Sequence, residues 1–185
     1  MSDTDIVMND EENVTTTEKK ENKFLAFLKE YFLFFLFLVA IILFRKFLYS
    51  PLYVHGESMM NTLHDGDIMI LDVIGYKTSG LDRFDIVVVD CKNELIIKRV
   101  IGLPGEKIEY KNNRLYVNGR WLEDPYGSNE TEDFKVTVPE GKYFVLGDNR
   151  QNSMDSRYFG AFSKDDIMGK TGLVLYPFNR FGNKD

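Results

Sequence analysis

Ser58 stands close to two histidines, and a serine beside a base can carry out nucleophilic catalysis. Its hydroxyl oxygen could attack a carbonyl carbon if a neighbouring group accepted the proton. His55 lies three residues before Ser58, and His64 lies six residues after it. Residues this close in sequence rarely present their side chains head-on with a carboxylate behind the base. We therefore expect both histidines to be exposed loop residues, although histidine is the usual base.

Lys98 is the better candidate base. A lysine accepts a proton only when its amine is neutral, and its usual pKa of about 10.4 prevents this near neutral pH. Burial lowers the pKa of a lysine because it disfavours the ammonium form. Lys98 lies in the apolar run 95–101, where the two-residue period of a strand puts Ile96 and Val100 on its face. A lysine on the solvent face of an edge strand is the alternative that this pattern leaves open.

A third segment, 147–160, concentrates turn formers and paired charges and reads Gly-Asp-Asn-Arg-Gln-Asn-Ser-Met-Asp-Ser-Arg-Tyr-Phe-Gly. It resembles the C-terminal signature of type I signal peptidases, membrane-bound serine proteases that remove signal peptides from exported proteins. Gly-Glu-Ser-Met-Met-Asn-Thr-Leu at 56–63 resembles the family's box around the nucleophilic serine. The segment 95–106 resembles the box around the catalytic lysine. The resemblance extends over 24–178.

This resemblance implies a role for individual residues, in a reaction that needs no cofactor. Ser58 would be the nucleophile, and Lys98 the general base for acylation and deacylation. Ser153 would orient the lysine ammonium group. The main-chain N–H of Ser58 would donate to the oxyanion, whereas Gly56 replaces a serine that supplies a second donor in some members. The charged residues that would brace the site are Arg99, Asp148, Arg150, Asp155 and Arg157.

Two positions depart from the family pattern. Asn61 stands where the family usually has proline, so the turn after the nucleophile lacks a fixed φ and is expected to be less rigid. Phe84 stands where the family often has glycine.

The expected substrate is an extended segment of a signal peptide, with small side chains at the first and third positions before the cut. Such a segment would bind by strand addition, with shallow apolar pockets for alternate side chains. The residues expected to line the pocket are Val54, Met59, Leu63 and Ile97.

The elements that must position these residues are predicted to be short strands, because alternating apolar runs separated by turns follow one another from residue 50 onward. We predict a mostly β catalytic domain over 50–185, with a helical turn at 163–167 capped by Ser163. Asn118-Gly119 predicts a two-residue hairpin turn. The resemblance adds an inserted β subdomain between residues 103 and 139. The predicted strands are 67–72, 85–89, 95–101, 107–110, 114–117, 120–122, 135–138, 142–146 and 168–175.

Residues 24–49 are predicted to form one transmembrane helix. The uncharged apolar run 31–44 is short of the roughly 20 residues that a bilayer requires, and its apolar flanks extend it. A buried core helix of a soluble protein is the alternative. Against it, this segment is apolar on every face and has no polar stripe for water. A cleavable signal peptide would not follow a long acidic region. More lysines before the span than basic residues after it favour a cytoplasmic N-terminus, with the catalytic domain outside the cell membrane.

Composition limits the partners. Residues 1–23 are acidic and almost free of large apolar side chains, which predicts a disordered tail. The net charge of −6, with scattered basic residues, argues against nucleic acid. A single cysteine excludes an intrachain disulfide, and with two histidines it makes a zinc site unexpected. The expected partners are therefore signal peptides of secretory precursors and the lipid bilayer.

Three other functions compete with the peptidase. A self-cleaving repressor-like protease also uses serine and lysine, but it would need a DNA-binding module in place of the acidic tail. A non-catalytic homologue that binds signal sequences would be expected to lack Ser58 or Lys98, and both are present. A membrane-anchored scaffold would not need the specific segment 147–160.

Overall fold

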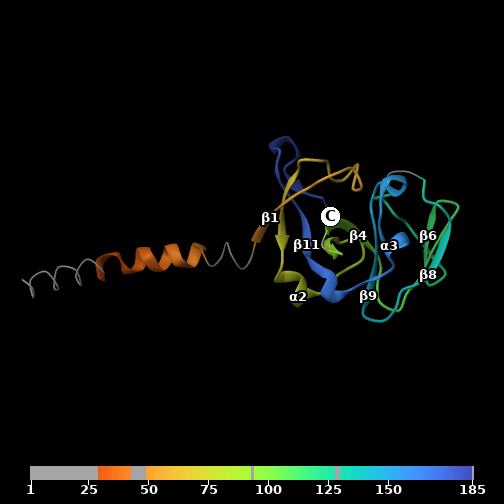
Figure 1. Ribbon diagram of the computed structural model, residues 1–185, viewed down its shortest axis with the longest axis horizontal. Helices are drawn as coiled ribbons and strands as arrows, with labels where there is room; N and C mark the ends of the chain where they lie inside the picture. The colour runs from red at the N-terminus through yellow and green to blue at the C-terminus, as the bar shows by residue number, and fades with distance from the viewer. Residues whose placement is uncertain (1–28, 43–48, 93, 128–129, 185) are drawn as a thin grey trace, which may run out of the picture. The chain divides into compact units, whose positions relative to one another are not determined.

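The computed structural model describes residues 29–42, 49–92, 94–127 and 130–184 (Figure 1). The chain divides into two compact units, 1–45 and 46–185. In the first unit, residues 29–42 form a helix with exposed side chains. The predicted tail and both ends of the predicted anchor lie outside the described residues. Among the described residues, no helix is both long enough and apolar enough to cross a bilayer.

The second unit is built on a large antiparallel sheet (Figure 1). Its strand order is β1-β2-β11-β3-β4-β9-β10, and β12 pairs with β11. β1 is an edge strand, and β4 lies near the middle with β3 on one side and β9 on the other. The strands are β1 (Tyr49–Tyr53), β2 (Ile68–Asp72), β3 (Ile86–Cys91), β4 (Glu94–Gly102), β9 (Lys142–Leu146), β10 (Phe162–Ser163), β11 (Ile167–Tyr176) and β12 (Gly182–Asn183).

A second, four-stranded sheet is formed by the chain between β4 and β9. Its order is β7-β6-β5-β8, and its tight turns use residues that tolerate positive φ. Asn112 and Asn113 have φ of 51° and 57°, and Asn118 and Gly119 have φ of 52° and 79°. The hairpin predicted at Asn118-Gly119 is therefore confirmed. The strands are β5 (Lys107–Lys111), β6 (Arg114–Val117), β7 (Arg120–Leu122) and β8 (Phe134–Thr137).

The prediction of a mostly β fold is confirmed, and all nine predicted strands are present with ends shifted by at most two residues. The strand β1 was not predicted, because its residues continue the apolar run assigned to the anchor. The helices α2 (Gly75–Ser79) and α3 (Ser156–Phe159) and the 3₁₀ turn Arg150–Asn152 are too short to show a helical period. The predicted turn near Ser163 is a 3₁₀ helix, Lys164–Asp166, with a Ser163–Asp166 capping box.

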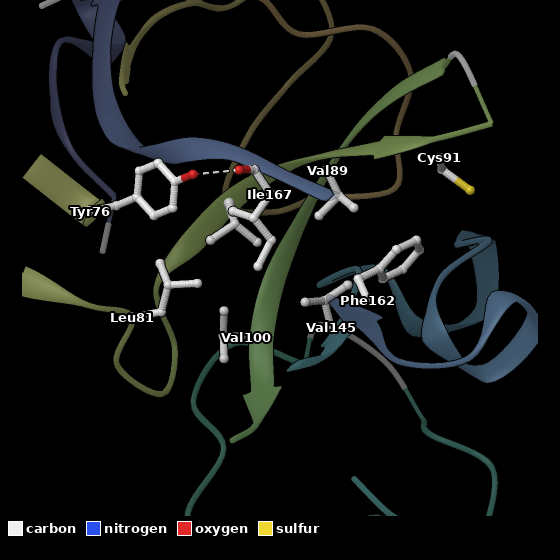
Figure 2. Close-up of a cluster of buried hydrophobic side chains, with 9 residues drawn as sticks. Tyr76, Leu81, Val89, Cys91, Val100, Val145, Phe162 and Ile167 are labelled. Atoms are coloured by element: carbon white, nitrogen blue, oxygen red, sulfur yellow. Dashed lines mark hydrogen bonds between the residues drawn. The ribbon is translucent and has the colours of Figure 1, made fainter. Parts of the chain in front are cut away.

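Two apolar clusters lie next to the candidate catalytic residues. The first packs between β3, β4, β9 and β11, and Figure 2 shows Val89, Val100 and Val145 converging within it. Tyr76 from α2 closes this cluster and donates its hydroxyl proton to the carbonyl oxygen of Ile167 at 2.7 Å. The second cluster contains Val54, Met59, Leu63, Met69, Ile86 and Val174.

Candidate active site

Ser58 lies in a tight turn that is fastened to the second apolar cluster. The N–H of Met60 donates to the carbonyl oxygen of Glu57 at 3.1 Å, and that of Leu63 donates to the carbonyl oxygen of Met59 at 2.9 Å. The side chains of Met59 and Leu63 are buried, while that of Ser58 is half-buried. The buried neighbours hold the backbone of the turn, and the hydroxyl of Ser58 stays accessible.

Lys98 meets Ser58 from the middle of β4. Its Nζ lies 2.8 Å from the Oγ of Ser58 and donates to the carbonyl oxygen of Ile97 at 2.9 Å. Such a distance lies within the reach that a general base needs. The structure thus brings together the two residues that the sequence singled out as nucleophile and base.

The pKa of Lys98 is lowered to about 8, mainly because burial disfavours the ammonium form. Only 3% of the residue is exposed. The negative charges of Asp155 and Asp148 raise the pKa and so oppose part of this effect. Val100 belongs to the first cluster and Ile96 packs against it, so the side of β4 that carries Lys98 is buried rather than facing solvent.

Arg99 and Asp148 join the strand of the base to the turn of the nucleophile. The guanidinium of Arg99 donates to both carboxylate oxygens of Asp148, with Nη2 2.8 Å from Oδ2, and neither side chain is exposed. The same Oδ2 accepts a hydrogen bond of 2.5 Å from the hydroxyl of Thr62. Thr62 follows Ser58 by four residues, so this chain of contacts links the positions of the two candidate catalytic residues.

The segment 147–157 is braced by two more arginines. The guanidinium of Arg157 donates to both carboxylate oxygens of Asp155, and Oδ2 of Asp155 also accepts from the N–H of Gly147 at 3.1 Å. Arg150 donates from Nε to the carbonyl oxygen of Gly147 at 2.9 Å. It also reaches the second sheet through Asp124 and the hydroxyl of Tyr110, each at 2.6 Å. Gly147 is therefore held from both sides.

Ser153 lies against the nucleophile turn. A Cβ atom at Gly147 would lie 2.3 Å from the Oγ of Ser153 and 2.5 Å from the carbonyl oxygen of Ser58, so only glycine fits there. The Oγ of Ser153 is buried and has no hydrogen-bond partner among the described residues. A buried hydroxyl without a partner can accept a hydrogen bond from an ammonium group.

A groove of about 370 Å³ opens beside Ser58 and Lys98. Val54, Met59 and Ile97, three of the four predicted pocket residues, lie along it. Leu63, the fourth, is not among the residues that line the groove; like Val54 and Met59 it is buried in the second cluster, and its role in the pocket stays a prediction. The groove is lined by residues 51–56, Ser58, Met59 and 95–98.

Among the described residues, neither imidazole makes a hydrogen bond to Ser58, whose Oγ is contacted by Lys98. His55 is exposed, as expected, and is one of the residues that line the groove. His64 is half-buried rather than exposed, and its backbone N–H donates to the carboxylate of Asp67 at 2.9 Å. For Asn61, the expectation of a less rigid turn stays a prediction.

Phe84 adopts a φ of 74°, a left-handed conformation that glycine takes without strain and that a bulky residue rarely adopts. This explains why glycine suits the position in the family. Two contacts hold Phe84 in this conformation. Its ring packs on that of Tyr126 at 5.4 Å between centroids, and its carbonyl oxygen accepts from Arg99 at 2.7 Å.

Thr62, Tyr126 and Arg180 take part in the site without having been predicted. Thr62 lies in the segment 56–63 that resembles the nucleophile box, so the sequence did indicate that it lies near the site. Its partner Asp148 is 86 residues away, and the sequence did not indicate that contact. The ring of Tyr126 covers the guanidinium of Arg99, with 3.5 Å between Cζ and the ring centroid. Arg180 donates to the carboxylate of Asp67 and to the carbonyl oxygen of Thr62. Nothing in the local sequence indicates the contacts of Tyr126 or Arg180.

Comparison with known proteins gives one consistent result. A family model described as signal peptidase, peptidase S26, matches residues 28–176. Signal peptidase IB of Staphylococcus aureus (strain Mu50) is 42% identical over 164 residues, which cover 77% of this chain and 86% of the relative. Signal peptidase I of Bacillus amyloliquefaciens is 44% identical over 154 residues, covering 76% and 83%. A crystal structure of a signal peptidase I from Enterococcus faecalis V583 is 40% identical and covers 50% of this chain and 97% of that one, with a TM-score of 0.47.

Proposed function

Because this chain belongs to the signal peptidases of family S26, we propose that Ser58 and Lys98 are the catalytic pair of a serine endopeptidase that cleaves signal peptides. The observation that carries this assignment is the 2.8 Å contact between the Lys98 amine and the Ser58 hydroxyl. The direct test is cleavage of a secretory precursor by the detergent-solubilised protein, compared with variants at these two positions.

In acylation, the neutral amine of Lys98 takes the proton of the Ser58 hydroxyl while Oγ attacks the carbonyl carbon of the scissile bond. The main-chain N–H of Ser58 donates to the oxyanion that forms. As the carbon–nitrogen bond breaks, the Lys98 ammonium returns the proton to the leaving amine. Lys98 then takes a proton from a water molecule whose oxygen attacks the acyl carbon, and the Lys98 ammonium returns this proton to the Oγ of Ser58 as the ester bond breaks.

Ser153 would hold the Lys98 ammonium between these two transfers. Its buried hydroxyl has no partner among the described residues, and a hydrogen bond accepted from the ammonium would satisfy it. The buried pairs of Arg99 with Asp148 and of Arg157 with Asp155 would fix the loops without taking part in bond chemistry.

We propose that the substrate binds as an added strand in the groove. β1 pairs only with β2, and β9 joins β4 only from Arg99 onward, so residues 94–98 of β4 pair on one side only in the described part of the chain. Both unpaired backbones border the groove beside Ser58. An extended peptide could therefore hydrogen-bond there while alternate side chains enter the apolar pocket of Val54, Met59 and Ile97.

This pocket predicts a sharp preference at the position just before the cut. A precursor with alanine there should be cleaved on the order of 10²-fold faster than one with phenylalanine, because a shallow pocket cannot accept the ring. As a matched control, phenylalanine at the second position before the cut should be tolerated, since successive side chains of a strand point to opposite faces. Specificity constants for the three precursors check this expectation, and equal values would contradict the pocket assignment.

We also propose that residues 24–49 anchor the enzyme in the cell membrane, with the catalytic domain on the outer side. The apolar, uncharged run 31–44 and the family resemblance support this placement. The anchor would confine enzyme and precursor to one surface and so raise their effective concentration.

The anchor makes a prediction about fractionation. The full-length chain should stay in the membrane pellet after a carbonate wash, whereas a chain of residues 50–185 should be released and should cleave membrane-inserted precursors more slowly. Immunoblots of pellet and supernatant measure this. Release of the full-length chain by carbonate would contradict the spanning helix.

A further inference from the structure

The C-terminal segment of the chain returns to the turn that carries Ser58. It forms the 3₁₀ helix Phe178–Arg180 and then β12, which pairs with Leu173 and Val174 of β11. The N–H of Lys184 donates to the carbonyl oxygen of Gly172 at 2.9 Å. The backbone beyond Arg180 is thus attached to the main sheet. Arg180 itself lies beyond the residues 28–176 that match the family model.

Arg180 bridges two points of the segment that follows the nucleophile. Its Nε donates to Oδ1 of Asp67 at 3.0 Å, and its Nη2 donates to Oδ2 at 3.1 Å. The same Nη2 donates to the carbonyl oxygen of Thr62 at 3.0 Å. Asp67 is buried and also accepts from the N–H of His64. One guanidinium therefore fixes both ends of residues 62–67.

Thr62 connects this clamp to the catalytic pair. Its N–H donates to the carbonyl oxygen of Met59 at 2.9 Å, which makes it part of the nucleophile turn. Its hydroxyl is held by Asp148 on the side of the base, while its carbonyl oxygen is held by Arg180 on the side of the C-terminus. Thr62 can therefore shift in neither direction without breaking a hydrogen bond.

We propose that Arg180 is a positioning residue for the reaction: it keeps Ser58 at hydrogen-bonding distance from Lys98 by clamping Thr62 and Asp67. This inference rests on the proposed role of Ser58. A misplacement of about 1 Å far from the chemistry can cost 10²-fold in rate. A lysine could not replace the clamp, because its ammonium is a point charge and lacks the planar fork that reaches a carboxylate and a carbonyl together.

The contacts of Arg180 are separate from the groove, so losing them should change kcat and KM to different extents. The groove is lined by residues 51–56, Ser58, Met59 and 95–98, so Arg180 is not needed to bind the peptide. Arg180→Gln and Arg180→Lys should therefore lower kcat about 10²-fold while KM changes less than about threefold. The pH at half-maximal rate should stay unchanged, because the burial of Lys98 is not altered.

Arg83 offers a matched control. It also donates to a carbonyl oxygen and to a carboxylate, those of Ile101 and Glu106, each at 2.5 Å. Its side chain is 16% exposed and that of Arg180 is 21% exposed. Arg83→Gln removes the same kinds of contact away from the nucleophile turn, so it should lower the melting temperature with kcat unchanged.

The experiment measures kcat, KM, the pH profile and thermal melting for the wild type and these variants with one secretory precursor. If Arg180→Gln does not fold, Arg180→Ala is assayed with added guanidinium, which should raise kcat for this variant and leave that of Arg83→Ala unchanged. A wild type that cleaves, together with Arg180 variants whose kcat equals that of Arg83→Gln, overturns the inference and leaves the proposed function intact. A wild type that cleaves no precursor overturns the proposed function itself.

Discussion

Replacing Ser58 with alanine is expected to lower the rate of precursor cleavage roughly 10⁶-fold, because loss of a serine nucleophile leaves only binding and oxyanion stabilisation. The change removes one oxygen atom from a half-buried side chain, so the fold should be retained. The measurement is cleavage of a secretory precursor by detergent-solubilised protein, with circular dichroism to check the fold.

Two controls separate a nucleophile from a structural serine. Ser79→Ala removes a hydroxyl that bonds to Gly75 within α2, and full activity should remain. The double variant of His55→Ala and His64→Ala should also stay active, since neither residue is placed as a base. If the double variant were as inactive as Ser58→Ala, a serine–histidine mechanism would replace the one proposed.

Lys98→Arg is expected to abolish cleavage as completely as Lys98→Ala, with a loss on the order of 10²–10⁴-fold. Arginine keeps the positive charge, but its guanidinium is not deprotonated in proteins and cannot accept the proton of Ser58. If Lys98 acted only as a fixed cation, arginine would retain much of the activity. Assays of both variants with one precursor distinguish these outcomes, and an active Lys98→Arg variant would falsify the pair.

The pH profile of the wild type tests the same assignment without a mutation. The pKa of Lys98 is lowered to about 8, so the neutral amine is a minor species at pH 7 and the major one at pH 9. The rate should accordingly rise with pH through a single ionisation near 8. Ser153→Ala should keep this shape with a milder loss of rate, because the base remains in place. A rate that is flat from pH 6 to 9 would contradict a lysine base.

The sequence predicted what depends on local patterns. Alternation around Lys98 indicated both a strand and a buried amine, and the structure has both. β1 was missed because an apolar run looks the same in an anchor and in an edge strand. The short helices α2 and α3 were missed because tertiary contacts, such as that of Tyr76 with Ile167, stabilise them.

The residues that hold the site together were harder to predict than those proposed to react. Ser58 and Lys98 stood in boxes that resemble a known family, whereas Thr62 and Arg180 depend on partners brought near by the fold. Arg180 lies 113 residues from Asp67, and no pattern in the intervening sequence relates them. Leu63 was placed in the pocket because it lies close to Ser58 in the sequence, but sequence distance does not say which side chains line the groove, and Leu63 is not among those that do.

The Arg99–Asp148 pair has a further consequence, because neither side chain is exposed and the ring of Tyr126 covers the guanidinium. Dissolved ions screen exposed charges beyond a Debye length of about 10 Å at 0.1 M salt, but they screen buried pairs much less. The link between the strand of the base and the turn of the nucleophile is therefore insulated from ionic strength. If the catalytic domain faces the outside of the cell, as proposed above, the ionic strength around it is not under cellular control, and this buried pair would keep the proposed reacting groups aligned at low and at high salt.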